Sequence, residues 1–387
     1  MLGCCWRFFE SASNDPTLND GNGGAAGGKV ARQHASHRNT LVIMSETVDV
    51  PDLPVDRLVR LRQILLALVF AVSIVSIMNW DQVWVVALEL SSMIFIFLLG
   101  GAVEGWRNMV AFILITWILA FVAEDLGVHT GAIFGAYQYS NQFGLMLDQV
   151  PMLILVAYFT AGYASLTIAR LISGITDVPR GWRLVGLAAA GSIVMVGWDL
   201  AMDPSTSVIG GEWIWTKGGN YFGIPLQNYW GWFILNFLIY AVYLLYSAYV
   251  STPRPTNEVT QRRFWYEPLI YWIAYALNII LLPVLGKTEG ISFSPLNVVK
   301  PPTDVGVVQL LWILSLIAVF SMLGPVLFAA MRLGEKPPLP LTGDLTKQPG
   351  SALIREPAVW VIILGIPAYI AAVCALGLTG GYAPLPG

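Results

Sequence analysis

The sequence predicts an all-α, polytopic integral membrane protein: a bundle of about nine transmembrane helices, with eight as the alternative count. Hydrophobic residues make up 56% of its 387 residues and charged residues only 12%. Soluble domains carry roughly 25% charged residues. Apolar runs of about 20 residues, the length that a helix needs to cross a bilayer, recur along the chain. These observations together favour a membrane bundle over any soluble class.

The first 43 residues differ from the rest of the chain. Residues 21–39, GNGGAAGGKVARQHASHRN, are low-complexity sequence without apolar residues to form a core, so we expect 1–43 to be disordered or a non-native extension. The segment lacks the run of about 7–15 apolar residues that a signal peptide needs. Met44 offers a second start, which makes 44–58 an acidic segment before a single transmembrane domain over 59–380.

The apolar runs predict the helices in order, and prolines and polar turns separate them. Pro151 begins the fourth span, and SGITDVPRG (173–181) follows it. Pro253 and Pro255 end the sixth. Pro283 in the seventh span and Pro367 in the ninth predict kinks. The predicted spans are 59–79, 83–102, 108–125, 150–172, 182–202, 229–250, 267–286, 306–331 and 358–379.

The distribution of basic residues predicts the orientation. With the N-terminus inside, the inner segments after residue 56 hold fourteen Lys and Arg residues. The outer segments hold three, Lys217, Lys287 and Lys300. Cytoplasmic loops carry the excess of basic residues in membrane proteins, so we expect the N-terminus inside and the C-terminus outside. Three glycine- and aromatic-rich connections, 126–149, 203–228 and 287–305, then fall on the outer side.

Acidic residues within the predicted spans are the candidate catalytic groups, because a charge in a bilayer is costly and marks a functional site by default. They are Asp199, Asp203, Glu124 and Glu89, all toward the outer ends of their spans. Asp199 and Asp203 lie four residues apart in GWDLAMDP (197–204) and therefore share one helix face. Two carboxylates this close in an apolar medium favour protonation of one of them, which would supply an acid at neutral pH.

Structural roles for these acids stay open at this point. Asp203, directly before Pro204, also fits a simple helix end. Glu124 in AFVAEDLG and the neighbouring Asp125 also fit solvated interfacial residues, and Glu89 in VVALELSSMIF also fits a hydrogen bond between helices. Asp199 is hardest to explain structurally because it lies within its span beside Trp198.

Two aromatic-rich segments predict the walls of a cavity. They are GVHTGAIFGAYQYS (127–140) and GGEWIWTKGGNYFGIPLQNYWGW (210–232), the latter with seven aromatic residues in 23. Membrane anchoring explains part of this enrichment. His129 has no partner at ligand spacing, so we predict no metal site. The predicted substrate contacts are Trp198, Tyr137, Tyr139, Trp213, Trp215, Tyr221, Asn228 and His129.

Three blocks carry a resemblance to a known family. EDLGVHTGAIFGAYQYS (124–140), WDLAMDP (198–204) and EWIWTKGGNYFGIPLQNYWGW (212–232), in this order, resemble the carotenoid biosynthesis membrane family, which contains the carotenoid C-1′ hydratases. The resemblance implies addition of water to a terminal isopropylidene double bond of a long polyene, with no organic cofactor and no metal. It carries over no assigned catalytic residues. The acidic segment after Met44 would suit a haloarchaeal protein and favours the conversion of bisanhydrobacterioruberin to bacterioruberin.

The residues present meet the needs of such a hydration. Protonation of the alkene gives a tertiary cation that water then captures, so an acid, a cation-tolerant wall and a base are required. We expect Asp199, or Asp203, to be the acid and Glu124 to accept a proton from the attacking water. Trp198, Trp213, Trp215, Tyr137 and Tyr221 are the expected cation-stabilising walls.

Other classes compete with this hypothesis. The closest alternatives are another carotenoid-tailoring enzyme or a pigment-binding protein, and a transporter is more distant because the inner halves of the spans hold few polar residues. A retinal Schiff base is disfavoured, since all six lysines lie outside the predicted spans. The net charge of −3 gives no reason to expect nucleic acid. The predicted partners are a C50 or other acyclic-ended carotenoid, water, the lipid of the cell membrane, and other enzymes of the carotenoid pathway.

Overall fold

The computed structural model describes residues 55–79, 82–140, 144–175, 177–251, 253–286, 288–297, 305–335, 353, 355–365 and 367–368. All of them belong to the unit Leu53–Gly387. The predicted extension 1–43 lies outside the described residues, as do the start of the predicted segment 44–58 and most of the predicted ninth span.

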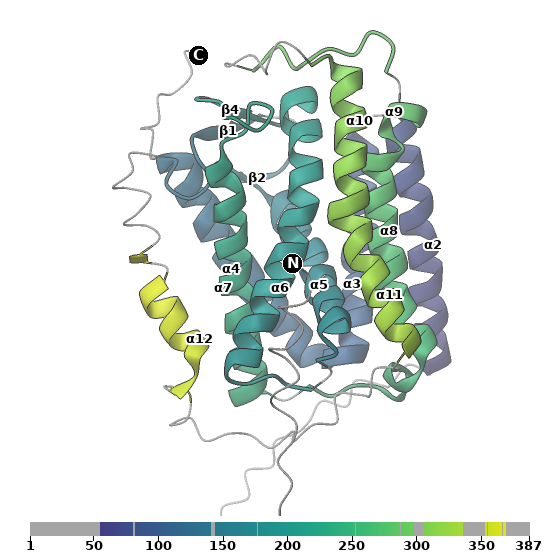
Figure 1. Ribbon diagram of the computed structural model, residues 1–387. Coiled ribbons are helices and arrows are strands. Elements are labelled where there is room, and N and C mark those ends of the chain that lie inside the picture. The colour runs from purple at the N-terminus through teal and green to yellow at the C-terminus, as the bar shows by residue number, and fades with distance from the viewer. Residues whose placement is uncertain are drawn as a thin grey trace, which may run out of the picture. The chain divides into compact units, whose positions relative to one another are not determined.

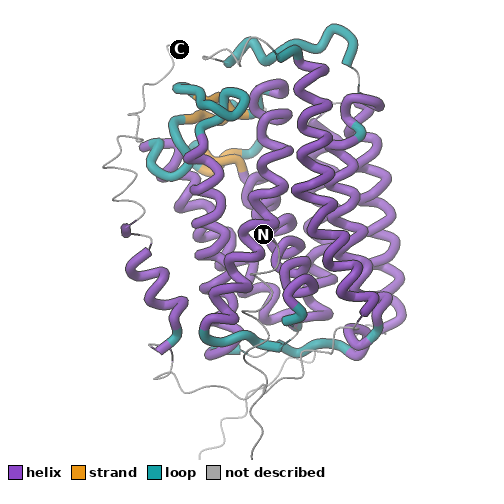
Figure 2. The backbone as a smooth tube through the Cα atoms, in the orientation of Figure 1, coloured by secondary structure: helices purple, strands orange, loops and turns teal. Residues whose placement is uncertain are grey.

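The described chain is almost entirely helical, which confirms the all-α class (Figure 2). Seven helices in the described ranges are long and apolar enough to cross a membrane. Two of these crossings contain a π-helical stretch, η2 (Pro204–Gly210) after α6 and η5 (Val319–Leu323) between α10 and α11. The helices that form the seven crossings are α2 (Val55–Asn79), α3 (Gln82–Glu104), α4 (Trp106–Thr130), α5 (Met152–Ser173), α6 (Trp182–Asp203), α7 (Leu226–Tyr249), and α10 (Val307–Ala318) with α11 (Gly324–Glu335).

The predicted seventh span is broken rather than continuous. It forms α8 (Tyr266–Ile280), of 15 residues, and then the single turn α9 (Leu282–Leu285). Pro283 lies in the first turn of α9, where a missing N–H leaves no hydrogen bond unmade. Of the predicted ninth span, the structure describes only α12 (Pro357–Trp360), η7 (Val361–Gly365) and two further residues. The count of nine therefore stays a prediction.

Helix α6 occupies a central position in the bundle (Figure 1). It packs against α5 and α7 along much of its length and also contacts α10 and η5. Helix α2 packs on α3 and α8, and α4 packs on α5 and α7. Side chains on the central helices are mostly buried, as in α5, whereas α4 exposes Leu114, Ile118 and Val122 on its outer face. This exposed apolar face fits a protein surrounded by lipid.

Two short sheets lie at the end of the bundle where α4 and α6 finish and α5 and α7 begin (Figure 1). Strand β1 (Tyr137–Tyr139) pairs antiparallel with β4 (Trp213–Trp215), with Tyr137 opposite Trp215. Strand β2 (Met146–Leu147) pairs with β3 (Val150–Pro151) just before α5. The β1–β4 pairing joins the two aromatic-rich connections that the sequence placed on one side of the membrane.

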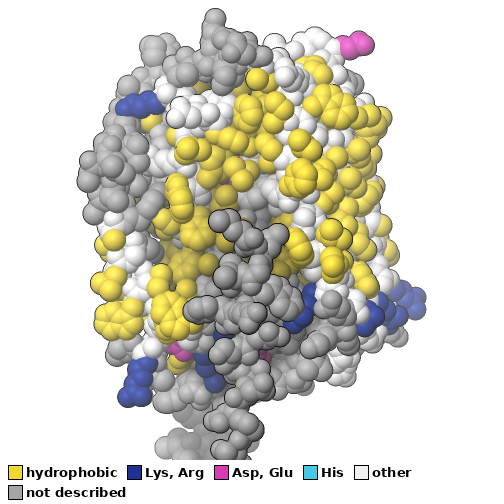
Figure 3. Space-filling view, in the orientation of Figure 1, with side chains coloured by type: hydrophobic (Ala, Val, Ile, Leu, Met, Phe, Trp, Pro, Cys, Tyr) yellow, Lys and Arg dark blue, Asp and Glu magenta, His cyan; other side chains and the backbone are white. Residues whose placement is uncertain are grey.

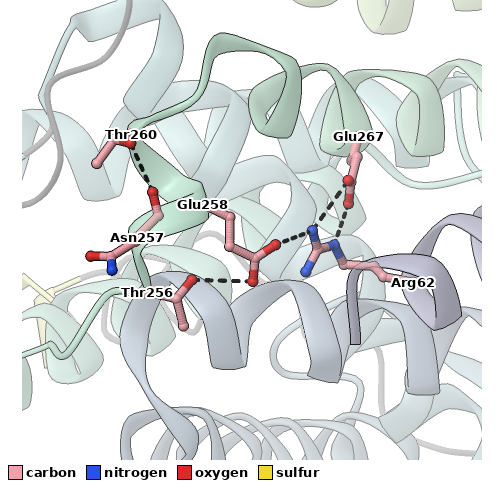
Figure 4. Close-up of polar contacts among 6 residues, drawn as sticks. All are labelled: Arg62, Thr256, Asn257, Glu258, Thr260 and Glu267. Atoms are coloured by element: carbon pink, nitrogen blue, oxygen red, sulfur yellow. Dashed lines mark hydrogen bonds and ion pairs between the residues drawn. The ribbon is translucent and has the colours of Figure 1, made fainter. Parts of the chain in front are cut away.

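The opposite end of the bundle is held by buried ion pairs (Figure 4). The guanidinium of Arg62 on α2 donates to Glu267 on α8 and, at 2.8 Å, to Glu258 in the short helix η3 (Asn257–Thr260). It also lies 4.8 Å from the ring centroid of Phe264 in η4 (Arg262–Trp265). A second buried pair joins Glu104 to Arg170, so α3 and α5 are tied at this end as well.

The outer surface separates apolar from basic side chains. Hydrophobic side chains cover most of the described surface in Figure 3, and Lys and Arg side chains gather mainly near its lower edge. This edge is the end that carries the Arg62 pairs. The segregation agrees with the charge bias in the sequence, and the inside position of this end stays a prediction.

We predict that Arg62→Leu lowers the free energy of unfolding by about 3–5 kcal/mol, because two largely buried carboxylates lose their cation. Arg60→Leu, two residues away on the same helix and exposed, should change it by less than about 0.5 kcal/mol. Denaturation of both variants in detergent measures the difference. Equal stabilities would show that the Arg62 pairs do not secure α2 to α8.

Candidate functional site

Asp199 and Asp203 are bridged by a single amide. Both lie in the last turns of α6 and both are buried. Asn228, in the first turn of α7, donates from Nδ2 to Asp199 Oδ2 at 3.0 Å and to Asp203 Oδ2 at 2.8 Å. The predicted shared face is therefore confirmed: the four-residue spacing on α6 brings both carboxylates to one amide group on α7.

The two aspartates differ in their remaining oxygens. Asp203 Oδ1 accepts a hydrogen bond of 2.9 Å from Nε1 of Trp213 on β4. Asp199 Oδ1 is buried and accepts none from the described residues. The chain passes directly from Asp203 into η2, where the Ser207 hydroxyl donates to the Asp203 carbonyl. Asp203 is therefore also the last residue of α6, which is the structural role that the sequence left open. Asp199 is thus the member of the pair with an oxygen free for a ligand.

Glu124 accepts hydrogen bonds from three tyrosines. The hydroxyls of Tyr137 and Tyr139 on β1 donate to Oε2 at 2.5 and 2.8 Å, and that of Tyr158 on α5 donates to Oε1 at 2.7 Å. The side chain is buried, unlike a solvated interfacial residue. Its charge interacts electrostatically with both Asp199 and Asp203. Three of the four predicted acids therefore form one cluster.

Aromatic rings surround this cluster. Trp232 stacks on Tyr158, with ring centroids 4.5 Å apart, and meets Trp198 edge-on at 6.0 Å. Trp215 lies 5.3 Å from Tyr137 across the β1–β4 pair. Tyr221 lies nearby and donates its hydroxyl to the Leu200 carbonyl of α6 at 2.7 Å. The predicted aromatic residues thus line the cluster, with the two strands fixing the positions of four of them.

Sequence reasoning missed three residues of this environment. Tyr158 lies in an apolar run without any acidic neighbour, so no local pattern identified it. Trp232 and Tyr229 are in the aromatic segment but were not among the predicted contacts. The Tyr229 hydroxyl is buried, makes no hydrogen bond to the described residues, and its ring lies 5.2 Å from that of Tyr221. These three residues can be identified only from the packing of α5 and α7 against α6.

Glu89 occupies a separate place. Its carboxylate on α3 accepts hydrogen bonds from Tyr275 at 3.0 Å and Thr160 at 3.3 Å. It lines a cavity of about 170 Å³ whose other walls include Trp198 and Trp213. Glu89 is therefore separated from the two aspartates by the indole rings of Trp198 and Trp213. Among the described residues, Glu89 shares no hydrogen bond with either aspartate. Its interhelical hydrogen bonds match the alternative that the sequence left open.

His129 lies apart from the cluster, near the exposed end of α4. Its ring nitrogens are 3.6 Å from Asp125 and 3.4 Å from Asp148, and its side chain is 45% exposed. The three side chains have ligand atoms within 4.8 Å of one another, but exposed acidic groups gather in this way without an ion. We assign no metal to them. The predicted contact of His129 with substrate stays a prediction.

A groove of about 450 Å³ opens between α6, α7 and η5, and neither Asp199 nor Asp203 is among the residues that line it. Val196, Gly197 and Leu200 of α6 line it, and these residues flank Asp199 in the sequence. Ser321 of η5 closes one wall: its hydroxyl donates to the Gly197 carbonyl at 2.6 Å, and a Cβ on Gly197 would come within 2.7 Å of the Ser321 carbonyl. The other lining residues are Ile193, Tyr229, Trp230, Phe233, Phe320 and Pro325.

A larger cavity, of about 870 Å³, lies around Arg62 at the opposite end of the bundle. Its buried acids, Glu258 and Glu267, are already paired with Arg62. This cavity therefore has no buried carboxylate available for proton transfer. The groove near Asp199 has a smaller volume, about 450 Å³. The Asp199 cluster nevertheless combines buried acids, aromatic walls and an adjoining apolar groove, so it is the candidate functional site.

A comparison with protein-family models matches residues 81–294 to the carotenoid biosynthesis protein family. This is more than half of the chain. The chain belongs to this family. It is therefore a multi-pass membrane protein of carotenoid biosynthesis, which acts on a carotenoid within a lipid bilayer. The matched residues of this carotenoid biosynthesis protein include the whole cluster and its aromatic walls, from Glu124 to Trp232, and also the separate Glu89. Searches among curated proteins and among solved structures gave no match.

Glu212 is an acid that the sequence did not single out. It lies between η2 and β4, outside the spans, and burial raises its pKa from an ordinary value of 4.5 to about 7. Because the folded state holds this proton more tightly than the unfolded chain, stability associated with Glu212 is fully present below about pH 4.5 and is lost as the pH rises through about 7.

We predict that Glu212→Gln removes this pH dependence. The melting temperature of the wild type minus that of the variant should fall between pH 5 and pH 8. Thermal unfolding of both proteins in the same detergent across this range measures it. A difference that is constant with pH would show that the Glu212 side chain titrates normally.

Proposed function

We propose that this carotenoid biosynthesis protein is a hydratase, which adds water across a terminal isopropylidene double bond of a long polyene. The observation that carries the proposal is the pair of buried aspartates on one amide, with Asp199 Oδ1 unpaired beside an apolar groove. Hydration of an alkene needs a proton donor first, and two adjacent buried carboxylates favour holding a proton because two negative charges repel each other.

Asp199 is the acid in the proposed reaction. Its proton adds to the less substituted carbon of the double bond, which leaves a tertiary cation on the neighbouring carbon. Water forms a C–O bond to this cation and passes a proton to Glu124. The three tyrosine hydroxyls hold the Glu124 carboxyl group in a fixed position for this transfer. Return of the proton to Asp199 completes the cycle, so alkene and water give a tertiary alcohol.

The aromatic walls suit the cationic intermediate. An indole or phenol face stabilises a nearby cation by roughly 0.5–2 kcal/mol. Trp198 and Trp213 lie against the aspartate pair, and Tyr137, Trp215 and Tyr221 extend the same surface. This arrangement delays loss of the cation to side reactions until water attacks.

The groove between α6, α7 and η5 suits the polyene. It is lined almost entirely by apolar side chains, and Ile193, Trp230 and Phe320 on its rim are exposed where lipid would surround the bundle. A carotenoid dissolved in the bilayer can enter sideways and bring one end toward Asp199. We further propose bisanhydrobacterioruberin as the substrate and the cell membrane as the location; both rest on the sequence resemblance and the acidic segment after Met44.

A pigment-binding protein without catalysis is the second candidate. The same groove and aromatic rings would bind a polyene in either case. The free Asp199 oxygen favours catalysis, because burial of an unsatisfied carboxylate is costly for a purely structural role. Product analysis separates the two candidates directly.

We predict that Asp199→Asn lowers the rate of hydration at least about 100-fold, the usual contribution of a general acid. Membranes containing the protein would be given an anhydro-carotenoid, and the water adduct measured by mass spectrometry. Asp125→Asn, the same change at a half-buried acid outside the cluster, is the matched control and should retain activity. In D₂O the wild-type product should carry one deuterium on carbon.

Undiminished hydration by the Asp199 variant would exclude it as the acid. Unchanged carotenoid in the presence of the wild-type protein, bound but without a water adduct, would support the pigment-binding alternative instead.

A further inference from the structure

Two adjoining cavities lie on the opposite side of α6 from the lipid-facing groove. Each has a volume of about 170 Å³. We call the one nearer the end of the bundle the outer cavity and the one that contains Glu89 the inner cavity. They share five lining residues, Ser76, Val85, Thr206, Glu212 and Asn278, so they adjoin each other between α2, α3, α8 and η2.

The outer cavity is polar and reaches the end of the bundle. Gln82, the exposed first residue of α3, lies at its mouth. Asn278 of α8 donates to Ser76 Oγ of α2 at 2.8 Å on its inner wall. Ser205 and Thr206 of η2 line another wall, and Glu212 lies where the two cavities meet. This surface has many groups that can bind water.

The inner cavity ends at the indoles that border the candidate site. Glu89 and Tyr275 form its polar part, hydrogen-bonded at 3.0 Å. Trp198 and Trp213 form another wall, and Nε1 of Trp213 donates to Asp203 on the far side. The cavity therefore leads from the end of the bundle to the back of the aspartate cluster.

Physical chemistry favours water in this space. Polar side chains within a membrane pair with one another or face a water-filled cavity. A water molecule occupies about 30 Å³ in the liquid, so the outer cavity, with mostly polar lining residues, has room for several. In the inner cavity, most walls are apolar, and the partners for water are Glu89, Tyr275 and the polar residues shared with the outer cavity. The cavity around Arg62 at the opposite end of the bundle shares no lining residue with the outer or the inner cavity.

We infer that the outer and inner cavities form the entry route for water to the active site, from the bundle end that carries Gln82 to the Trp198–Trp213 wall. The use of this water as a reactant rests on the proposed hydratase function. Polyene and water then reach the cluster from opposite sides of α6. Glu212, with its pKa raised to about 7, is positioned to make the junction less polar when protonated and more strongly hydrated when ionised.

Cysteine accessibility tests the route independently of catalysis. Cys4, Cys5 and Cys374 would first be replaced by serine, and single cysteines then placed at Gln82, Ser76, Thr206 or Ser73. A small, charged, membrane-impermeant methanethiosulfonate would be applied separately to each face of sealed vesicles. Ser73 is the matched control: it lies one turn from Ser76 on α2, is buried and does not line either cavity.

We expect the Gln82→Cys protein to react fastest, and the Ser76→Cys and Thr206→Cys proteins to react from the same face at least 10-fold faster than Ser73→Cys. Reaction of Gln82→Cys alone, with the Ser76 and Thr206 cysteines as unreactive as that at Ser73, would overturn the route. Neither result depends on hydratase activity, so the route and the proposed function can fail separately.

A second measurement tests whether water from these two cavities is the reactant in the proposed hydration. Modification of Ser76→Cys should lower hydration at least 10-fold, whereas modification of Gln82→Cys at the wide mouth should lower it less than 2-fold. Full activity of the modified Ser76→Cys protein would show that reactant water enters elsewhere. The unmodified variants serve as folding controls.

Discussion

The hydrogen bonds from Asn228 to Asp199 and Asp203 are the interaction on which the rest of the site depends. Two carboxylates within an apolar bundle repel each other and lose their hydration, so a placed donor has to hold them together. The donor comes from the first turn of α7 and the acids from the end of α6. The close packing of these two helices is therefore a condition for the site, not only for the fold.

The two connections that contain β1 and β4 position the aromatic residues around the acids. Pairing of β1 with β4 sets Tyr137 and Tyr139 on Glu124 and Trp213 on Asp203, so two segments more than 70 residues apart fix one cluster. The ion pairs of Arg62 and of Glu104 with Arg170 hold the opposite end of the bundle. These two groups of polar contacts secure the two ends of the bundle, and hydrogen bonds such as that between Ser165 and Tyr240 join the helices between them.

The apolar runs predicted most of the fold because a span of about 20 apolar residues has few alternatives to a membrane helix. The predicted span 267–286 was less accurate, since Pro283 ends the ladder of hydrogen bonds and leaves a 15-residue α8. In the site, the four-residue spacing placed Asp199 with Asp203. Nothing local placed Glu89 behind Trp198 or Tyr158 on Glu124, because these positions depend on how helices far apart in sequence pack.

The sequence by itself determined the membrane class, the approximate spans and four of the buried acids, because composition and periodicity report directly on the solvent that each segment meets. The tertiary structure decided which acids act together, which oxygen is left unpaired, and where a groove and a polar cavity open. Those features arise from contacts between α6, α7, η2 and the two strands. Their geometry depends on crossing angles and strand register, neither of which a hydropathy pattern encodes.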